Sequence, residues 1–302
     1  MMKKVVITGA GGFIGKSLTA EFIKKGYFVY AIDRKADNLE EFSSCENIKI
    51  LAVDLHNIEY LTSQIDQGID YFYHFAWQGI SSADYKDINI QKDNILTSVS
   101  VAQMAVHLNT RKFIFFGSNQ QYLMNINSID NEFCYSSVYG ICKASAQMLC
   151  KSVAVNKMQF NTVLFTNVFG VGDYSKRTAN MFISKMLKGE DIDLIEGNNL
   201  YDWLYIDDAI NGILAVSEHG KNNKDYYIGS RKLRTFKEII LDVAGILNSK
   251  VNLNFGTYSD TSYTDYSKID LEALYNDTGF ECKSAFNESV NKTAEWVSKL
   301  GW

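Results

Sequence analysis

The stretch that decides the fold is VVITGAGGFIG, at residues 5–15. The apolar run VVIT leads into a turn that is rich in glycine, and an amphipathic segment follows at 14–25. A strand that turns through glycines into a helix lets the backbone approach a pyrophosphate, and the free N–H groups of the helix start face that anion. The turn therefore predicts a dinucleotide-binding βαβ unit. Its expected cofactor contacts are Gly9, Gly12, Phe13, Ile14 and Gly15.

Short apolar runs continue to alternate with longer amphipathic stretches along the first half of the chain. Strands are predicted at 3–10, 28–33, 48–54, 70–77, 112–118 and 161–170, and helices at 14–25, 94–108, 178–188, 207–218 and 286–300. The polar segment 250–268 is predicted to be a loop. Alternating strands and helices indicate a parallel sheet that is covered on both faces. We therefore expect an α/β fold, with a Rossmann-type doubly wound sheet at 1–165 that parts of 200–230 complete. A smaller mixed α/β substrate domain is expected at 166–302.

Composition and charge exclude several classes of protein. The chain is 46% hydrophobic and 22% charged, its formal charge is −5, and no apolar run approaches the ~20 residues that cross a bilayer. A nucleic-acid or membrane partner is therefore not expected. The five cysteines (Cys45, Cys134, Cys142, Cys150 and Cys282) form no C-x-x-C pair, and the four histidines are scattered, so no metal site is predicted. Buried thiols in a reducing, cytoplasmic compartment are the expectation.

Two carboxylates at predicted strand ends indicate which dinucleotide binds. Asp33 follows Gly15 by 18 residues and can accept hydrogen bonds from the adenosine ribose, which favours NAD over NADP. Arg34 and Lys35 follow at once, and either could bind a 2′-phosphate, so NADP stays open. Asp54 could bond the adenine amino group, and a plain turn residue is the alternative.

The stretch SSVYGICKAS, at residues 136–145, carries a candidate acid and base. Tyr139 and Lys143 share one face of a predicted helix, and Ser118 ends a predicted strand 21 residues before the tyrosine. An ammonium beside a phenol favours phenolate and is expected to lower its pKa from ~10. Such a tyrosine can exchange a proton with a sugar or alcohol oxygen during hydride transfer. Ser118 would hydrogen-bond the same oxygen.

Several motifs together resemble the extended short-chain dehydrogenase/reductases, in the NAD-dependent epimerase/dehydratase group that acts on nucleotide sugars. They are TGAGGFIG, HFAW, FGSNQQY, YGICK, NVFGVGD and YDWLYIDD, and the similarity spans roughly residues 4–300. The resemblance implies that Tyr139 is the catalytic acid/base and that Lys143 also holds the nicotinamide ribose. It further implies cofactor contacts at Leu55, Phe75, Ala76 and Asn94, and substrate contacts at Trp77 and Asn167. It also implies a homodimer that packs the helices at 94–108 and 140–155 into a four-helix bundle.

The residues after Ser118 bear on which reaction is catalysed. A 4,6-dehydratase of this family has an acidic pair there, whereas this chain has Asn119 and Gln120, amides that cannot transfer protons. They could instead bind a sugar hydroxyl, with ordinary turn residues as the alternative. HFAWQG, GSNQQY and YDWLYIDD look most like reductases of nucleotide-linked 4-keto-6-deoxy sugars. A 4-epimerase and a non-catalytic dinucleotide-binding protein remain as alternatives.

The chain departs from the family where a diphosphate would bind. Sugar epimerases have an arginine where this chain has Tyr201, before the aspartate of YDWLY, and their later arginine also has no counterpart here. Arg177 is the remaining candidate for the diphosphate, because a guanidinium suits phosphate oxygens. Arg231 and Arg234 are the next candidates, and exposed helix-surface arginines are the plain alternative for all three.

Overall fold

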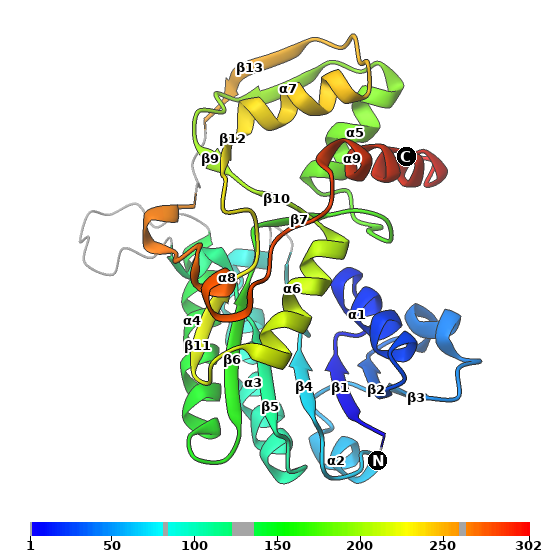
Figure 1. Cartoon of the computed structure of the whole chain (residues 1–302), viewed down its shortest axis with the longest axis vertical. Helices are drawn as coiled ribbons and strands as arrows, with labels where there is room; N and C mark the ends of the chain where they lie inside the picture. The colour runs from blue at the N-terminus through cyan, green and yellow to red at the C-terminus, as the bar shows by residue number, and fades with distance from the viewer. Residues whose placement is uncertain (1, 81–83, 123–135, 260–263) are drawn as a thin grey trace.

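The structure is a computed structural model that describes residues 2–80, 84–122, 136–259 and 264–302, and its main element is a seven-stranded sheet (Figure 1). The strands run in the order β11-β6-β5-β4-β1-β2-β3, and all neighbours are parallel. They are β1 (Lys4–Thr8), β2 (Phe28–Asp33), β3 (Ile48–Ala52), β4 (Tyr71–His74), β5 (Lys112–Phe116), β6 (Gln159–Leu164) and β11 (Lys224–Tyr227). The strand order reverses between β1 and β4, where doubly wound sheets bind their ligands.

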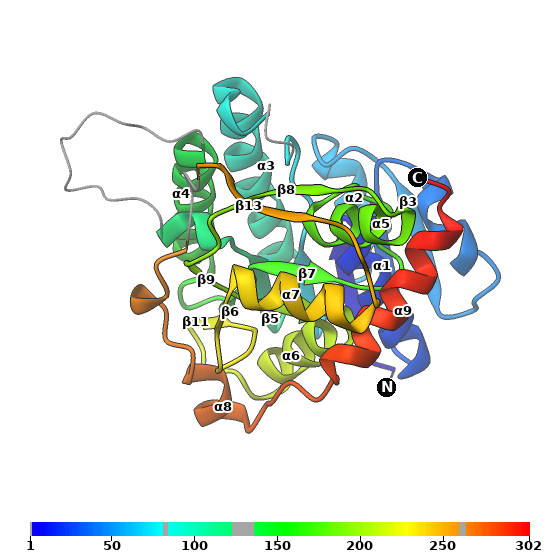
Figure 2. The ribbon, with the colours of Figure 1, turned by 90° about the horizontal axis from the view of Figure 1, so that it is seen from above.

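Helices cover both faces of this sheet (Figure 2). One face carries α1 (Phe13–Lys24) and α6 (Ile206–His219), and the other carries α2 (Ile58–Gln64), α3 (Ile88–His107) and α4 (Ser136–Ala154). Because successive residues of a strand point to opposite faces, Val5 and Ile7 join one hydrophobic core and Val6 joins the other. The predicted Rossmann-type, doubly wound α/β fold is confirmed.

The chain after residue 166 builds most of a second group of elements beyond the carboxyl ends of the central strands (Figure 1). Its described strands pair as β7 (Asn167–Phe169) with β10 (Trp203–Tyr205), β9 (Leu200–Tyr201) with β12 (Arg234–Thr235), and β8 (Ile192–Ile195) with β13 (Leu253–Tyr258). Its helices are α5 (Thr178–Lys188), α7 (Phe236–Ile246) and α9 (Phe286–Lys299), whereas α8 (Ala273–Thr278) lies beside α6 and β11 of the central sheet. Short 3-10 helices lie at η1 (Ala36–Phe42), η2 (Asp84–Lys86), η3 (Asn119–Tyr122) and η4 (Tyr266–Lys268). The division at 165/166 stays a prediction, and β11 brings a segment from 200–230 into the central sheet.

Two expectations about strands were wrong. The run 161–170 is not one strand, because β6 ends at Leu164 and β7 begins at Asn167 in another sheet. Thr166 lies between them and donates a hydrogen bond to the carbonyl oxygen of Asp202 at 2.9 Å, which holds the chain where it leaves the central sheet. The segment 250–268 contains β13, because Leu253 and Phe255 alternate inward and pack against the core.

The helix predicted at 94–108 begins earlier, at Ile88. The carboxylate of Asp87 accepts hydrogen bonds from the backbone N–H groups of Asn89 and Ile90 and so caps the helix. The early start places the first two turns of α3 beside the end of β4. Within the described residues, no helix combines the length and the apolar character that a bilayer crossing requires.

Candidate active site

The glycine turn between β1 and α1 brings backbone segments together more closely than side chains would permit. Gly9 has a φ of +70°, and a Cβ there would lie 2.8 Å from the backbone nitrogen of Ala76. A Cβ on Gly15 would overlap the carbonyl oxygen of Gly9. Gly12 donates to that same oxygen at 3.1 Å and precedes α1 as its N-cap, without a side-chain cap. The free N–H groups at the start of α1 therefore suit a phosphate.

Asp33 ends β2 beside this turn. Its Oδ2 accepts a hydrogen bond from Gly11 N at 3.0 Å, and its Oδ1 accepts one from Lys35 N at 3.2 Å. A Cβ on Gly11 would lie 2.9 Å from Oδ2, so the glycine leaves space beside the carboxylate. Arg34 and Lys35 are exposed. The glycine cradle and the adjacent carboxylate fit the pyrophosphate and ribose of a dinucleotide.

Ser118, Tyr139 and Lys143 converge at the carboxyl end of β5. Ser118 follows the strand by two residues, and the other two lie one turn apart on α4. The Nζ of Lys143 donates to the carbonyl oxygen of Phe116 at 2.8 Å. Hydrogen bonding by Ser118 lowers the pKa of the Tyr139 phenol. The three residues are 9%, 7% and 2% exposed, respectively. The predicted constellation therefore forms one buried cluster.

The electrostatics of this cluster correct one expectation. Burial raises the pKa of the Tyr139 phenol, and Tyr85 raises it further. Hydrogen bonding by Ser118 and the charge of Arg177 lower this pKa, but they do not offset the increase. Burial also lowers the pKa of Lys143 to about 7. Its ammonium faces Phe116 O and lies 3.8 Å from the ring centre of Trp77. Lys143 therefore does not lower the pKa of the phenol below its ordinary value, and Tyr139 keeps its proton at neutral pH.

We expect Lys143→Met to stabilise the fold more at pH 6.5 than at pH 9.5. The pKa of Lys143 is about 7 in the folded chain against an ordinary 10.5, so folding disfavours the ammonium. The stability that neutral Lys143 provides is present above pH 10.5 and is lost as the pH falls through 7. Urea unfolding should show a gain of about 1–2 kcal/mol at pH 6.5. The exposed Lys157→Met is the control, and an equal gain at both pH values would contradict the prediction.

Two aromatic side chains surround the Tyr139 phenol. The ring centre of Tyr85 lies 4.5 Å from that of Tyr139, and Trp77 meets the tyrosine edge-on at 6.0 Å. Trp77 was a predicted substrate contact, whereas sequence reasoning did not select Tyr85. It lies in the polar stretch DYKDIN, which has no periodicity or motif that could have indicated it.

Ser118 is held by a chain of amides that the sequence analysis also missed. Its backbone N–H donates to Gln121 Oε1 at 2.7 Å, and Gln121 Nε2 donates to Gln147 Oε1 at 2.5 Å. Gln147 in turn donates to Asp225 Oδ2 at 2.7 Å and so reaches β11. The spacing of these residues along the chain gives no signal, because the network depends on β11 returning to the sheet.

The neighbouring amides Asn119 and Gln120 differ in their partners. Asn119 Nδ2 donates to Thr264 Oγ1 at 2.6 Å. The backbone N–H of Gln120 donates to Ser118 Oγ at 3.2 Å, and its buried Oε1 has no hydrogen-bond partner among the described residues. Both amides therefore lie beside Ser118, and the question of sugar contacts stays a prediction.

The HFAW segment lies against the glycine turn. Phe75 packs on Phe116 with ring centres 4.9 Å apart, and Ala76 N donates to Thr8 Oγ1 at 3.4 Å. His74 bonds Thr8 Oγ1 through Nδ1 at 2.8 Å and Ser98 Oγ through Nε2 at 2.9 Å. Burial and the charge of Lys143 lower the pKa of His74 to about 3, so its imidazole is neutral. The segment is thus a fixed wall of the site.

Asn94 anchors the loop that follows this segment. Its Oδ1 accepts from Gln78 N at 2.8 Å, and its Nδ2 donates to the carbonyl oxygens of Gln78 and Ile90 at 2.9 and 3.0 Å. The amide is 5% exposed. The side chain thus holds the connection between β4 and α3, next to the predicted nicotinamide region.

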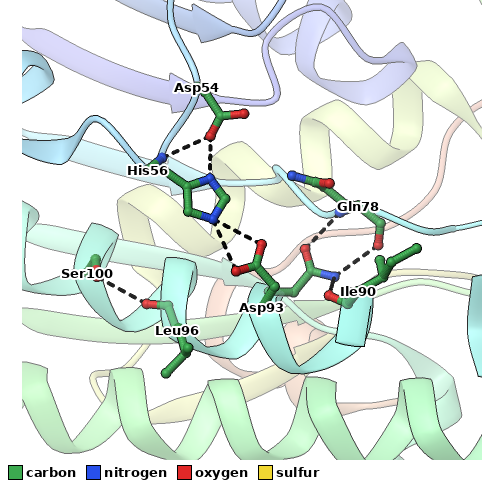
Figure 3. Close-up of polar contacts among 8 residues, drawn as sticks. Asp54, His56, Gln78, Ile90, Asp93, Leu96 and Ser100 are labelled. Atoms are coloured by element: carbon green, nitrogen blue, oxygen red, sulfur yellow. Dashed lines mark hydrogen bonds and ion pairs between the residues drawn. The ribbon is translucent and has the colours of Figure 1, made fainter. Parts of the chain in front are cut away.

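Asp54 lies at the other predicted cofactor position, after β3, and is joined to a histidine (Figure 3). Its Oδ1 accepts from His56 N at 2.9 Å and lies 2.5 Å from His56 Nδ1, while His56 Nε2 lies 3.0 Å from Asp93 Oδ2. Hydrogen bonds with Asp93 and Asp54 raise the pKa of His56. Leu55 packs against the core beneath α3. Any adenine contact by Asp54 would therefore use its remaining oxygen.

The candidates in the second half of the chain have different surroundings. Asn167 is half-buried at the start of β7. Arg177 is exposed before α5, and its charge offsets part of the increase in the pKa values of Tyr139 and Tyr85. Tyr201 packs on Phe236. With Asp202, Trp203, Ser230 and Arg234 among its neighbours, it lines a cavity of 290 Å³ whose lining residues do not include the Ser118 cluster.

The two alternative arginines are paired with carboxylates. Arg231 binds Glu272 and Glu281, and Arg234 binds Asp242. Arg177 therefore remains the candidate whose charge acts on the pKa of the Tyr139 phenol. Within the residues that the structure describes, no cluster of metal-ligating side chains is found. Cys134 lies outside those residues.

Comparison with known proteins identifies the family. The sequence model of the NAD dependent epimerase/dehydratase family matches residues 5–229. The chain belongs to this family. Among relatives, the UDP-N-acetyl-alpha-D-glucosaminuronate decarboxylase of Bacillus cytotoxicus is 22% identical, and the match covers 99% of each chain.

Solved structures of nucleotide-sugar epimerases share the fold. The UDP-glucose 4-epimerase of Thermotoga maritima, solved with UDP-glucose, superposes with a TM-score of 0.82 and 22% identity, over 99% of this chain and 100% of that one. The UDP-glucuronic acid 4-epimerase of Bacillus cereus, solved with NAD, gives 0.79 and 21%, over 98% and 99%. Membership of the NAD-dependent epimerase/dehydratase family confirms the resemblance to extended short-chain dehydrogenase/reductases and the expectation of NAD as cofactor.

Proposed function

We propose that this chain is an NAD(P)-dependent reductase that delivers a hydride to the C4 ketone of a nucleotide-linked 4-keto-6-deoxy sugar. The observation that carries the proposal is the state of the Tyr139 phenol. Burial raises its pKa, so the group is protonated at neutral pH, and Ser118 lies in the same buried cluster. A protonated, positioned phenol is what the reduction of a ketone requires at the oxygen.

The residues of the site divide the work of binding and proton transfer. Gly9, Gly12 and Gly15 leave room for the pyrophosphate. Asp33 would accept hydrogen bonds from the adenosine ribose hydroxyls, and Lys143 would hold the nicotinamide ribose. When bound, the reduced cofactor supplies the hydride. Tyr139 gives its phenolic proton to the C4 oxygen as the C–H bond forms, so that the ketone becomes an alcohol. Ser118 donates a hydrogen bond to the same oxygen and fixes its place.

The neutral pair after Ser118 supports reduction rather than dehydration. Elimination of water needs an added acid and base, and neither Asn119 nor Gln120 can exchange a proton usefully. The Nδ2 of Asn119 also donates a hydrogen bond to Thr264 Oγ1. Arg177, whose charge acts on the Tyr139 phenol, is the group we assign to the diphosphate of the substrate.

A nucleotide-sugar 4-epimerase is the second candidate. It is favoured by the likeness in fold to two solved 4-epimerases. An epimerase uses the same Ser118, Tyr139 and Lys143, but it must first take a proton from the sugar hydroxyl, so its tyrosine must begin as a phenolate. For that first step, the positive charge of bound NAD would have to lower the raised pKa of Tyr139.

Cofactor turnover tests the proposal. Purified protein should oxidise NADH or NADPH only when a 4-keto-sugar nucleotide is supplied, in a panel that varies the base and the sugar. Interconversion of 4-hydroxyl epimers with tightly held NAD and no net oxidation would overturn reduction in favour of epimerisation. Binding of the dinucleotide with neither activity would support a non-catalytic protein.

We further propose that two copies associate through α3 and α4. These helices pack side by side (Figure 2) and expose several large apolar side chains, namely Leu96, Ile141, Met148 and Leu149, and the exposed Val155 directly follows α4. Helices with exposed apolar faces favour burial against a partner.

The double variant Leu96→Glu with Met148→Glu should therefore be monomeric. Both side chains are well exposed, at 62% and 64%, so the change should leave the monomer folded. Light scattering coupled to size exclusion measures the mass. Leu241→Glu, on α7 and 49% exposed, is the control and should stay dimeric. A monomeric wild type would contradict the proposed interface.

A further inference from the structure

Gln91, in the first turns of α3, is a buried amide that binds one loop at three points. Its Oε1 accepts from the indole Nε1 of Trp77 at 2.9 Å, and its Nε2 donates to the carbonyl oxygens of Gly79 and Asp84 at 2.8 and 3.1 Å. Gln91 is 0% exposed. Both N–H donors and one acceptor site are thus used within the connection from β4 to α3. A buried amide satisfied in this way fixes the positions of Trp77, Gly79 and Asp84 relative to one another.

The Trp77 indole, which Gln91 holds, contacts both Lys143 and Tyr139. The Nζ of Lys143 lies 3.8 Å from the ring centre of Trp77, and Tyr139 meets the indole edge-on at 6.0 Å, with 82° between the planes. A cation over a desolvated indole is attracted by about 1–2 kcal/mol. The position of the ring plane therefore influences where the ammonium rests.

Trp77 makes both contacts with one side chain, through its Nε1 donor and its aromatic face. An aliphatic side chain could fill the space but could neither attract the ammonium nor bond to Gln91. Phenylalanine would retain an aromatic face but would lose the Nε1 donor that fixes its direction. Gly79 completes the arrangement, because its φ is +67° and a Cβ there would lie 2.7 Å from Ile90 Cγ2 and 3.1 Å from Gln91 Nε2.

We propose that Trp77, held by Gln91, is a positioning residue that sets the Lys143 ammonium relative to the Tyr139 phenol. Neither side chain takes part in proton or hydride transfer. Their effect on turnover rests on the proposed function, whereas their effect on the placement of Lys143 does not. The two residues should act as one unit, because Gln91 reaches the cluster only through the indole and its loop.

A double-mutant cycle tests this unit with Trp77→Phe, Gln91→Leu and the pair together, with Trp302→Phe as the control. Each single variant should weaken NADH binding about 3- to 10-fold and lower kcat about 10-fold, with KM for the sugar changed less than about 3-fold. NADH affinity and kcat of the double variant should be no lower than those of either single variant. Each single substitution already removes the contact between Gln91 and Trp77, so the second substitution removes nothing further. Trp302→Phe should match the wild type.

Indole fluorescence gives a readout that needs no sugar. The wild-type spectrum minus that of Trp77→Phe isolates the emission of Trp77, and in Gln91→Leu this component should move to longer wavelength and become more accessible to acrylamide. If Gln91→Leu does not fold, Gln91→Glu replaces it. Glutamate keeps the acceptor for Nε1, so the Trp77 emission should stay unchanged while the loop contacts are lost.

Three results would overturn the proposal: unchanged NADH affinity in both single variants, multiplicative losses in the pair, or a Trp77 component that is unmoved in Gln91→Leu. A wild type that reduces no keto-sugar would reject the proposed function alone. The NADH affinities and the emission of Trp77 would still decide the role of the two residues.

Discussion

Tyr139→Phe is expected to lower kcat about 10²- to 10⁴-fold, the range that a positioned proton donor contributes. The substitution removes only the phenolic oxygen, and the ring can keep its contacts with Trp77 and Tyr85. NADH affinity should therefore stay within about 3-fold of the wild type. Steady-state oxidation of NADH with the keto-sugar, together with fluorescence titration of NADH, separates the two effects.

Tyr85→Phe is the matched control, because it removes a second phenolic oxygen from the ring that lies 4.5 Å from Tyr139. Its turnover should fall by less than about 10-fold, since the proposed proton does not pass through it. Equal losses of kcat in Tyr139→Phe and Tyr85→Phe would show that removing either phenolic oxygen disrupts the packing of the cluster. Full turnover of Tyr139→Phe would reject the proton role of Tyr139.

Gly15→Ala should reduce NADH affinity about 100-fold, equivalent to about 3 kcal/mol. A Cβ at this position would overlap the carbonyl oxygen of Gly9 and lie 2.9 Å from Ala10 Cα. Both neighbours are backbone atoms, so the turn itself must move, and the proposed pyrophosphate cradle moves with it. Titration with NADH measures the affinity, and urea unfolding measures the accompanying loss of stability.

Gly245→Ala is the control for this substitution. Gly245 lies in α7, and a Cβ there would meet nothing within 4 Å. Alanine should stabilise this helix by about 1 kcal/mol without changing NADH binding. Wild-type affinity in Gly15→Ala would mean that the dinucleotide does not use the turn between β1 and α1.

Features that depend on neighbouring residues were predictable from the sequence. The glycine turn, the alternation of strands and helices, and the spacing of Tyr139 and Lys143 all follow from local geometry, since a turn or a helical face involves residues only a few positions apart. The family motifs then placed Ser118 with them. The candidate site was therefore identified in outline before any fold was known.

Features that depend on pairing between distant segments were not predictable. Strand β13 appears in a polar stretch because β8 offers it a partner, and the apolar run at 161–170 divides because β7 pairs with β10 outside the central sheet. Backbone hydrogen bonds stabilise either arrangement, so side-chain pattern alone cannot select the partner. Tyr85 was missed because its polar stretch has no periodicity or motif, and the fold alone brings its ring against Tyr139.

Local sequence patterns predict a strand that turns through glycines into a helix, and a tyrosine and a lysine on one face of another helix. The chemistry of these two side chains depends on the surroundings that the fold gives them. Burial raises the pKa of Tyr139 and lowers that of Lys143, and the ammonium faces Phe116 and an indole tethered by Gln91. The physical reason is desolvation, which depends on what surrounds a charge in space and not on its spacing along the chain.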